Sequence, residues 1–230
     1  MCVHPMTIAI DGPAASGKST VGEALAERLE YLYFDTGVMY RAVTWAALER
    51  GVDVENEEAV TGLAEALEIE VTDATDDDGR QYTVLADGSD VTWEIRKPEV
   101  DATVSVVSAY RGVRHALVTK QRQIAADRPV VMVGRDIGTV VLPEADLKIY
   151  LDASVEERAR RRWLEMRDRG KDAECGAVLD AMRRRDRIDS NREVSPLRAA
   201  QDAVRIDTTD VDVATVVDEA ERLVHERDCP

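Results

Sequence analysis

The sequence lacks the features of an exported or membrane-inserted chain. None of its apolar runs approaches the ~18–20 residues that a bilayer-spanning helix needs. Residues 1–5 have neither the basic segment nor the apolar segment of a secretory signal. The three cysteines, Cys2, Cys175 and Cys229, fall in no metal-binding or redox spacing, which is typical of reduced thiols. We therefore expect a cytoplasmic protein with no membrane partner.

Positive charge is also scarce, and this argues against a nucleic-acid partner. The 230 residues carry 46 acidic and 30 basic side chains, so the formal net charge of −16 would repel a phosphate backbone. The histidines His4, His115 and His225 are isolated in sequence and predict no metal site. The excess of acidic residues over lysine is consistent with a salt-rich cytoplasm, a hypothesis that activity and stability measured against added potassium chloride would test.

Short β-branched runs alternate with helical periods, a pattern typical of a parallel α/β sheet. The chain is long enough for one α/β domain, or for a core with a smaller inserted lobe. Strands are predicted at residues 7–10, 32–34, 130–133, 147–151 and 204–206, and several of these are nearly continuous apolar runs, as in strands buried on both faces. Apolar residues recur at helical spacing from Val21 to Leu29, from Val113 to Ile124 and from Val213 to Val224. We interpret these helical stripes as core packing.

Residues 68–95 break this alternation and predict a small antiparallel sheet. Turns are expected at Asp78-Gly79 and Asp87-Gly88, because both residue types tolerate positive φ between alternating segments. The predicted fold is therefore a parallel five-stranded sheet flanked by helices, with an inserted lobe that contains the antiparallel strands.

A phosphate-binding loop follows the first predicted strand. The segment Gly12-Pro13-Ala14-Ala15-Ser16-Gly17-Lys18-Ser19 matches G-x-x-x-x-G-K-[ST], and Thr20 completes the predicted ATP-binding residues. Its backbone N–H groups would face phosphate oxygens, while Lys18 reaches the β- and γ-phosphates and Ser19 offers its hydroxyl to Mg²⁺. An apolar strand precedes the loop and an amphipathic helix follows it, so a glycine-rich turn that binds nothing is the weaker interpretation. We predict ATP or GTP binding, with Mg²⁺ as the cofactor.

The loop alone does not distinguish a kinase from a GTPase switch or a motor. A GTPase should offer an N-K-x-D-type segment that reads guanine, and the sequence has none. A motor would need an acidic run closing a later strand, but at residues 133–136 Arg135 precedes Asp136. Arginines concentrate between Arg158 and Arg198, and their planar forks suit fixed anionic ligands. The sequence thus favours a phosphate acceptor held by arginine.

Three further segments resemble those of the bacterial cytidylate kinases, which are P-loop nucleoside-monophosphate kinases. Residues 35–41, DTGVMYR, look like D-[ST]-G-x-x-Y-R, and residues 134–141, GRDIGTVV, are similar to G-R-D-x-G-T-V-V. Residues 185–192, RDRIDSNR, resemble R-D-x-x-D-x-x-R. The resemblance covers nearly the whole chain in the family's order. It implies phosphorylation of CMP, and of dCMP, by Mg·ATP.

The resemblance also implies an organisation and an assembly state. The core would comprise residues 1–36, 105–157 and 190–230, the acceptor-binding lobe residues 37–104, and a short helical lid residues 158–189. The lid would close over ATP, and the protein would be a monomer.

For the acceptor, the resemblance implies a site built mainly from arginines and carboxylates. Arg41 and Arg135 would hold its α-phosphate. The predicted CMP-binding residues are Thr36, Tyr40, Arg41, Ser105, Arg114, Arg135, Asp136, Arg185, Asp189 and Arg192. The predicted catalytic residues are Lys18, Arg41, Arg135, Arg158 and Arg162, the last two being lid residues one helical turn apart.

Within that set, the resemblance assigns Ser105, Arg114 and Asp136 to the cytosine base. A carboxylate and an arginine complement cytosine, which offers an amino donor at N4 and acceptors at N3 and O2. Uracil would instead present a carbonyl to Asp136. Arg185, Asp189 and Arg192 would hold the ribose and phosphate, with Asp189 accepting from a sugar hydroxyl.

Several alternatives stay open at the level of sequence. Ser105 could be a helix cap, Arg114 a surface charge, and Asp35 and Thr36 caps of the next helix. The acceptor could be UMP, AMP or shikimate instead of CMP. The chain could also be a nucleotide-binding regulator that transfers no phosphate, or a nucleic-acid end kinase, although the acidic balance disfavours the latter.

Overall fold

The computed structural model describes residues 6–126, 128–168, 170 and 173–228. Cys2, His4, Cys229 and the start of the chain, on which the export prediction rests, lie outside the described residues. The elements in chain order are β1 (Thr7–Asp11), α1 (Lys18–Leu29), β2 (Leu32–Asp35), α2 (Gly37–Glu49), α3 (Glu57–Ala66), β3 (Ile69–Asp73), β4 (Tyr82–Ala86), β5 (Ser89–Asp90), η1 (Glu94–Arg96), α4 (Pro98–Val107), α5 (Arg111–Ala125), β6 (Val130–Gly134), η2 (Ile137–Val141), β7 (Leu147–Asp152), α6 (Val155–Asp168), α7 (Cys175–Asn191), β8 (Val204–Asp207) and α8 (Val213–Asp228).

The chain divides into two compact units. Unit 1 comprises Met1–Asp35 and Arg122–Pro230, and unit 2 comprises Thr36–Gln121. The core, lobe and lid boundaries expected from the sequence stay a prediction. Over the described residues, no helix combines the length and the apolar character needed to cross a membrane.

Unit 1 is built on a five-stranded sheet with the strand order β2-β6-β1-β7-β8. Every neighbouring pair is parallel, and all five strands predicted from the sequence are confirmed. The strands β1, β6 and β7 are buried along almost their whole length, as strands covered on both faces are. Their carboxyl ends meet at one edge of the sheet, where ligands bind in open α/β folds.

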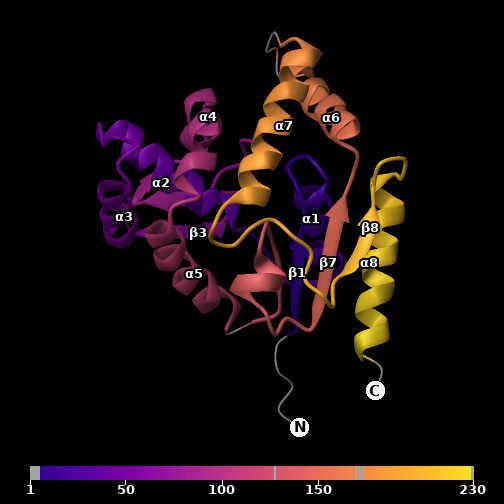
Figure 1. The fold of residues 1–230 in the computed structure, drawn as a ribbon. Coiled ribbons are helices and arrows are strands. Elements are labelled where there is room, and N and C mark those ends of the chain that lie inside the picture. Colours follow the sequence, from indigo (N-terminus) through magenta and orange to yellow (C-terminus); the bar gives the residue numbers. More distant parts are fainter. Residues whose placement is uncertain (1–5, 127, 169, 171–172, 229–230) are drawn as a thin grey trace. The chain divides into compact units, whose positions relative to one another are not determined.

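Helices α1 and α8 pack together against one face of this sheet (Figure 1). Val21 and Leu25 of α1 are fully buried with Val216 and Val217 of α8, as their helical spacing predicts. Val213, in contrast, was predicted to face the core and is 46% exposed. It is the first residue of α8, where no further turn of helix brings it over the sheet.

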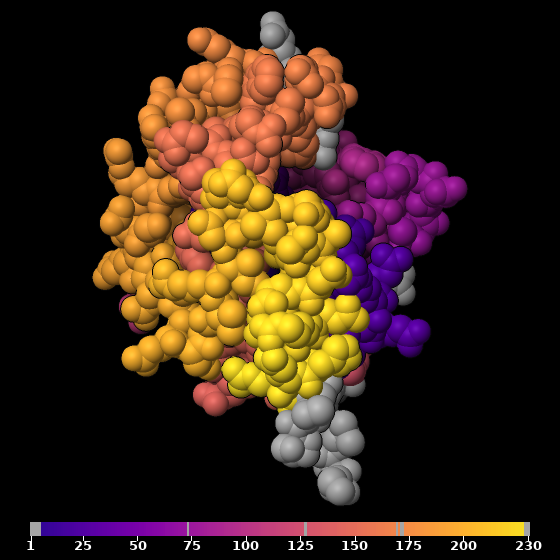
Figure 2. Space-filling model, turned by 90° about the vertical axis from the view of Figure 1, so that its right-hand side faces the viewer, coloured from indigo at the N-terminus to yellow at the C-terminus, as the bar shows by residue number. Residues whose placement is uncertain are grey.

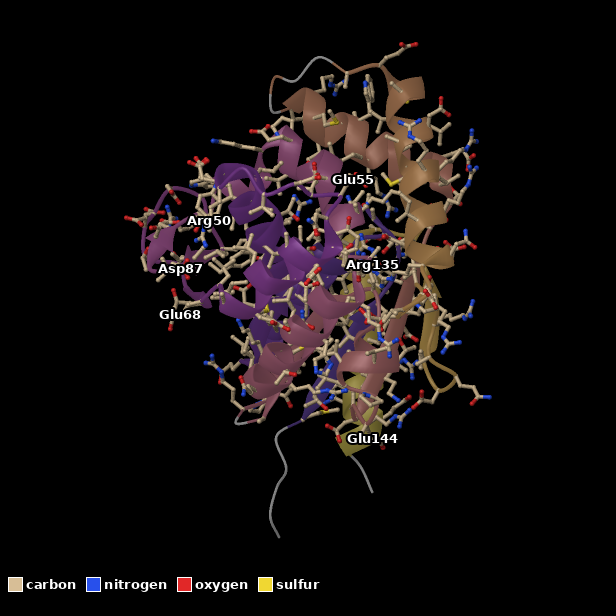
Figure 3. The ribbon with its side chains drawn as sticks, turned by 60° about the vertical axis from the view of Figure 1, so that its left-hand side comes forward. Arg50, Glu55, Glu68, Asp87, Arg135 and Glu144 are labelled. Atoms are coloured by element: carbon tan, nitrogen blue, oxygen red, sulfur yellow. The ribbon has the colours of Figure 1, made fainter. Side chains whose placement is uncertain are left out.

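Unit 2 carries the small antiparallel sheet predicted for residues 68–95, with the order β3-β4-β5. Asp87 and Gly88 form its tight turn between β4 and β5, with φ of 47° and 75°. Asp87 also accepts from Arg50 at 2.6 Å and from the backbone N–H of Glu68 at 2.9 Å, and Figure 3 shows these residues next to one another.

Candidate active site

The phosphate loop joins β1 to α1 in the conformation that its sequence predicts. Ala15 and Gly17 are left-handed, with φ of 59° and 93°. Gly12 has a φ of 153°, and a Cβ there would lie 2.0 Å from the carbonyl oxygen of Leu151. Only glycine fits this position, because the loop passes directly against the end of β7. The loop is thereby fixed to the edge where the strands end.

Lys18 begins α1 and is buried inside this loop. Its Nζ donates to the carbonyl oxygen of Pro13 at 2.5 Å and to Ser16 Oγ at 3.5 Å. Burial, together with the charge of Arg135, lowers the pKa of Lys18 well below its ordinary value. A buried cation at a helix N-terminus strongly favours an anion, and phosphate oxygens suit this geometry.

Ser19 is the next residue of α1, and its side chain contacts Asp35, the last residue of β2. Its Oγ donates to Asp35 Oδ2 at 3.3 Å. The hydroxyl and the carboxylate are both hard oxygen ligands of the kind that Mg²⁺ prefers. The predicted metal-binding residue therefore has a carboxylate beside it.

A pocket of about 860 Å³ opens next to the phosphate loop in unit 1. It is lined by Ala15, Ser16, Gly17, Thr20, Val21, Glu157, Arg160, Arg161, Arg162, Glu165, Thr208, Thr209, Asp210, Val211, Asp212, Val213 and Val216. Figure 2 shows this face, where the C-terminal residues in yellow lie directly beneath the α6 and α7 residues in orange.

Arg161 of α6 holds one wall of this pocket in place. Its guanidinium donates to Thr208 Oγ1 at 3.0 Å, to the Thr208 carbonyl oxygen, and to Glu157 Oε1 at 2.9 Å. Thr208 Oγ1 in turn donates to the Ser16 carbonyl oxygen at 3.1 Å. The segment between β8 and α8 was not predicted as a site, although a polar run after the last parallel strand is a usable signal.

The two predicted lid arginines differ in their surroundings. Arg158 is buried and donates to the carbonyl oxygens of Ala153 at 2.9 Å and Ala14 at 3.3 Å. It also forms a two-pronged pair with Asp186 at 3.1 and 2.7 Å. Arg162 lies against the pocket, where it donates to Glu165 Oε2 at 2.9 Å. Arg158 thus ties α6 and α7 to the phosphate loop, and a catalytic role for either arginine stays a prediction.

Unit 1 also brings together five of the predicted acceptor residues, Arg135, Asp136, Arg185, Asp189 and Arg192. Arg135, which is labelled in Figure 3, donates from Nε to Asp189 Oδ2 at 3.0 Å, and Asp189 lies near the end of α7. Arg192 lies 3.9 Å from Asp136 Oδ1. Burial by itself would raise the pKa of Asp189, but the surrounding arginines Arg135, Arg185 and Arg192 hold it below its ordinary value. This cluster of buried charges is typical of a functional site.

Unit 2 holds the other predicted acceptor residues. Arg41 donates to Asp101 Oδ1 at 2.5 Å and to the Ile95 carbonyl oxygen at 3.1 Å. The Arg114 guanidinium lies 5.2 Å from the centre of the Tyr40 ring and donates to the Ser108 carbonyl oxygen at 3.0 Å. These contacts orient two guanidinium groups within one unit.

Two of the alternatives left open by the sequence, Ser105 as a helix cap and Arg114 as a surface charge, are wrong. Ser105 lies inside α4 and is buried, so it does not cap a helix. Arg114 is 3% exposed and is not a surface charge. Thr36, within the described part of the chain, directly precedes α2 without a capping hydrogen bond from its side chain. The position of Ser105 within α4 and the burial of Arg114 decided these two cases, and the local sequence does not reveal either property.

A parallel sheet whose first strand runs into a phosphate loop defines a P-loop nucleotide-binding protein. The shikimate kinase of Bacteroides thetaiotaomicron shares this fold, with a TM-score of 0.50 and 11% identity over 96% of this chain and 98% of its own. The family model for cytidylate kinase matches residues 8–226. The chain belongs to the cytidylate kinase family, as the resemblance of its motifs indicated.

Individual relatives agree with this assignment over most of the chain. The cytidylate kinase of Bacillus velezensis is 47% identical over 222 residues, covering 96% of this chain and 97% of its own. That of Chloroflexus aggregans is 56% identical over 187 residues and covers 81% of each chain.

Proposed function

We propose that this protein transfers the γ-phosphoryl group of ATP to the α-phosphate of CMP, and of dCMP, to give ADP and the nucleoside diphosphate. The observation that carries this proposal is the pair Arg135–Asp136, which follows β6 beside the strand that leads into the phosphate loop. It combines a phosphate-binding guanidinium with a carboxylate that can accept from the amino group of cytosine. The cytidylate kinase relatives support the same assignment.

ATP would bind with its phosphates in the loop Gly12–Thr20 and its adenosine in the adjoining pocket. The pocket volume of about 860 Å³ suits a nucleoside, and its lining mixes the apolar side chains Val211 and Val213 with the hydroxyls of Thr208 and Thr209.

Mg²⁺ would be held by the hydroxyl of Ser19, next to the carboxylate of Asp35. Among the described residues, no group of three or more His, Cys, Asp or Glu side chains could hold a metal ion. Mg²⁺ needs only a few ligands from the protein when phosphate oxygens and water supply the others. When bound, the ion would neutralise charge on the β- and γ-phosphates.

CMP would be held through its phosphate by Arg41 and Arg135, and through its base by Ser105, Arg114 and Asp136. Thr36, Tyr40, Arg185, Asp189 and Arg192 would complete the acceptor site. The pairing of Asp189 with Arg135 gives this carboxylate an orienting role, besides the contact with the ribose that the resemblance implies.

The chemistry needs no strong general base, because the attacking phosphate oxygen is already an anion. Catalysis then depends on in-line positioning and on cations that stabilise the charge of the transferring group. Lys18, Arg41 and Arg135 would supply those cations. Arg158 and Arg162 would act from the lid, which must exclude water so that ATP is not hydrolysed.

An ADP-release assay with Mg·ATP and CMP, dCMP, UMP, AMP or GMP tests the proposal. High rates with CMP and dCMP, and low rates with the others, are expected. ADP release with no dependence on a monophosphate would contradict a kinase and favour a nucleotide-binding regulator. Gel filtration tests the expected monomer, and cell fractionation the expected location in the cytoplasm.

A further inference from the structure

Asp11 is a buried carboxylate to which the reaction above gives no role. It is the last residue of β1 and is 3% exposed. Its Oδ1 accepts the backbone N–H of Ile137 at 2.7 Å, and its Oδ2 accepts that of Gly138 at 2.8 Å. Both oxygens of one carboxylate are therefore used to hold two successive amides of η2.

These two amides lie directly behind the acceptor pair. Ile137 follows Asp136 in the chain, and Gly134, which precedes Arg135, is paired with Asp11 in the register of β1 and β6. Arg135 and Asp136 are thus fixed on one side by the strand ladder and on the other side by the side chain of Asp11.

The same aspartate directly precedes the phosphate loop. Gly12 is its chain neighbour, and the charge of Lys18 acts on its carboxylate. The space around Gly138 is also narrow, since a Cβ there would lie 3.1 Å from Lys148 Cδ and 3.5 Å from Asp11 Oδ2. A side chain at position 138 would therefore crowd the contact between this amide and Asp11.

Burial of the Asp11 carboxylate destabilises its charged form. Burial, with the like charge of Asp136, raises the pKa of Asp11 to about 6, while the two amides and Lys18 act in the opposite direction. Burial, together with nearby charges that include Asp11, raises the pKa of Tyr150 in β7. An apolar residue would avoid that cost but would leave two buried amides without partners.

We propose that Asp11 is a positioning residue that holds the Arg135–Asp136 acceptor pair in a fixed place relative to the phosphate loop. The inference rests on the proposed function, because it assigns the acceptor to Arg135 and Asp136. Asp11 touches neither nucleotide in this scheme and acts through the backbone of residues 137 and 138.

Asp11→Asn tests the proposal with little change of shape. The amide side chain can accept from one N–H, but its own NH₂ group would face the other, so one contact is lost. The matched control is Asp146→Asn, since Asp146 directly precedes β7 and accepts the backbone N–H of Thr7, at the opposite end of β1 from Asp11, at 2.7 Å. Both variants are compared with the wild type by calorimetric titration of CMP and, separately, of ATP.

We expect Asp11→Asn to weaken CMP binding roughly tenfold, as the loss of one hydrogen bond to a charged group would. ATP binding should change less than about threefold, and Asp146→Asn should leave both affinities unchanged. In Asp11→Asn, the amide hydrogens of Ile137 and Gly138 should also exchange faster than in the wild type. Equal losses for CMP and ATP, or no loss for CMP, would overturn the proposal.

Failure of the proposed function gives a different result from failure of this inference. A wild-type protein that binds no CMP would remove the function, whereas a wild type and an Asp11→Asn variant that bind CMP equally well would remove only the role of Asp11. If Asp11→Asn does not fold, Asp11→Glu keeps the charge but displaces it by one methylene. Selective weakening of CMP binding in Asp11→Glu supports the role, and unchanged CMP binding contradicts it.

Discussion

Arg135 and Asp189 form a partly buried ion pair in which Arg135 Nε lies 3.0 Å from Asp189 Oδ2, joining the residue after β6 to the last turn of α7. The Asp189 side chain is 5% exposed, and the charges of Arg185 and Arg192 also act on it. The contact uses Nε of the guanidinium, and in the proposed function the remaining nitrogens of Arg135 would hold a phosphate.

Asp189→Asn should weaken CMP binding and lower stability. Because the arginines hold the pKa of Asp189 below its ordinary value, its charge stabilises the native state above about pH 4, and this contribution disappears as pH falls. We expect a loss of roughly 1.5–3 kcal/mol in unfolding free energy at pH 7 and a smaller difference at pH 3. Urea unfolding at both pH values measures this. A difference that does not depend on pH would contradict the assigned charge state.

Lys18→Ala should separate catalysis from acceptor binding. The Lys18 amine is enclosed by the phosphate loop, where it would stabilise charge on the transferring phosphoryl group. We expect kcat to fall roughly 100- to 1,000-fold while the Kd for CMP changes little. Lys97→Ala, at an exposed lysine of unit 2 that pairs with Glu94, is the control. Near-normal turnover in Lys18→Ala would rule out the proposed chemistry.

Asp136→Asn should change which base is accepted. An amide can donate to the carbonyl of uracil, whereas the carboxylate only accepts and so matches the amino group of cytosine. We expect kcat/KM for CMP to fall roughly 100-fold and the ratio of UMP to CMP activity to rise. The nucleotide panel measures both. If CMP and UMP activities fell in parallel, Asp136 would not read the base.

Arg161→Lys should weaken ATP binding with little effect on CMP. A lysine ammonium cannot reproduce the fork that contacts Glu157 and Thr208 together, so the wall of the pocket would loosen. We expect KM for ATP to rise roughly tenfold. Arg222→Lys is the control, because Arg222 also pairs with a glutamate, Glu219, but is 51% exposed and does not line the pocket. Equal effects of the two variants would remove the special role of Arg161.

Most of the sheet and the phosphate loop could be predicted from sequence because their signals are local. The strand at 7–10, the loop from Gly12 to Ser19 and the turn at Asp87-Gly88 each depend on residues adjacent in the chain. Their residue types restrict φ or bury both faces of a strand, so short patterns were sufficient.

What the sequence did not reveal depends on long-range partners. Arg158 meets Asp186 across 28 residues, and Asp11 meets the amides of Ile137 and Gly138 across 126 and 127. Nothing near Asp11 in the chain identifies those donors. Val213 fits the apolar stripe of α8 but lies at its first position, where it lines the pocket instead of the core.

The raised pKa of Asp11 predicts a specific pH dependence of stability. Its pKa in the folded protein is about 6, above the ordinary value of 3.8, so between these values the native state binds a proton that the unfolded chain does not. The contribution of Asp11 to stability must therefore fall as pH rises from about 4 to 6 and stay level above that range, by roughly 3 kcal/mol at most. Asp11→Asn cannot ionise and loses this slope.

The measurement is urea unfolding of wild type, Asp11→Asn and Asp146→Asn between pH 4 and 8. Subtracting the stability curve of Asp11→Asn from that of the wild type cancels the contribution of every carboxylate whose environment the substitution leaves unchanged. The unfolding free energy of the wild type, relative to that of Asp11→Asn, should therefore fall as pH rises to about 6 and then stay constant. The charges of Asp136 and Lys18 act on Asp11 in opposite directions and, with burial, set the midpoint of this change. Parallel curves would mean that burial does not raise the Asp11 pKa, and a difference of the opposite sign would mean that the two amides and Lys18 outweigh burial.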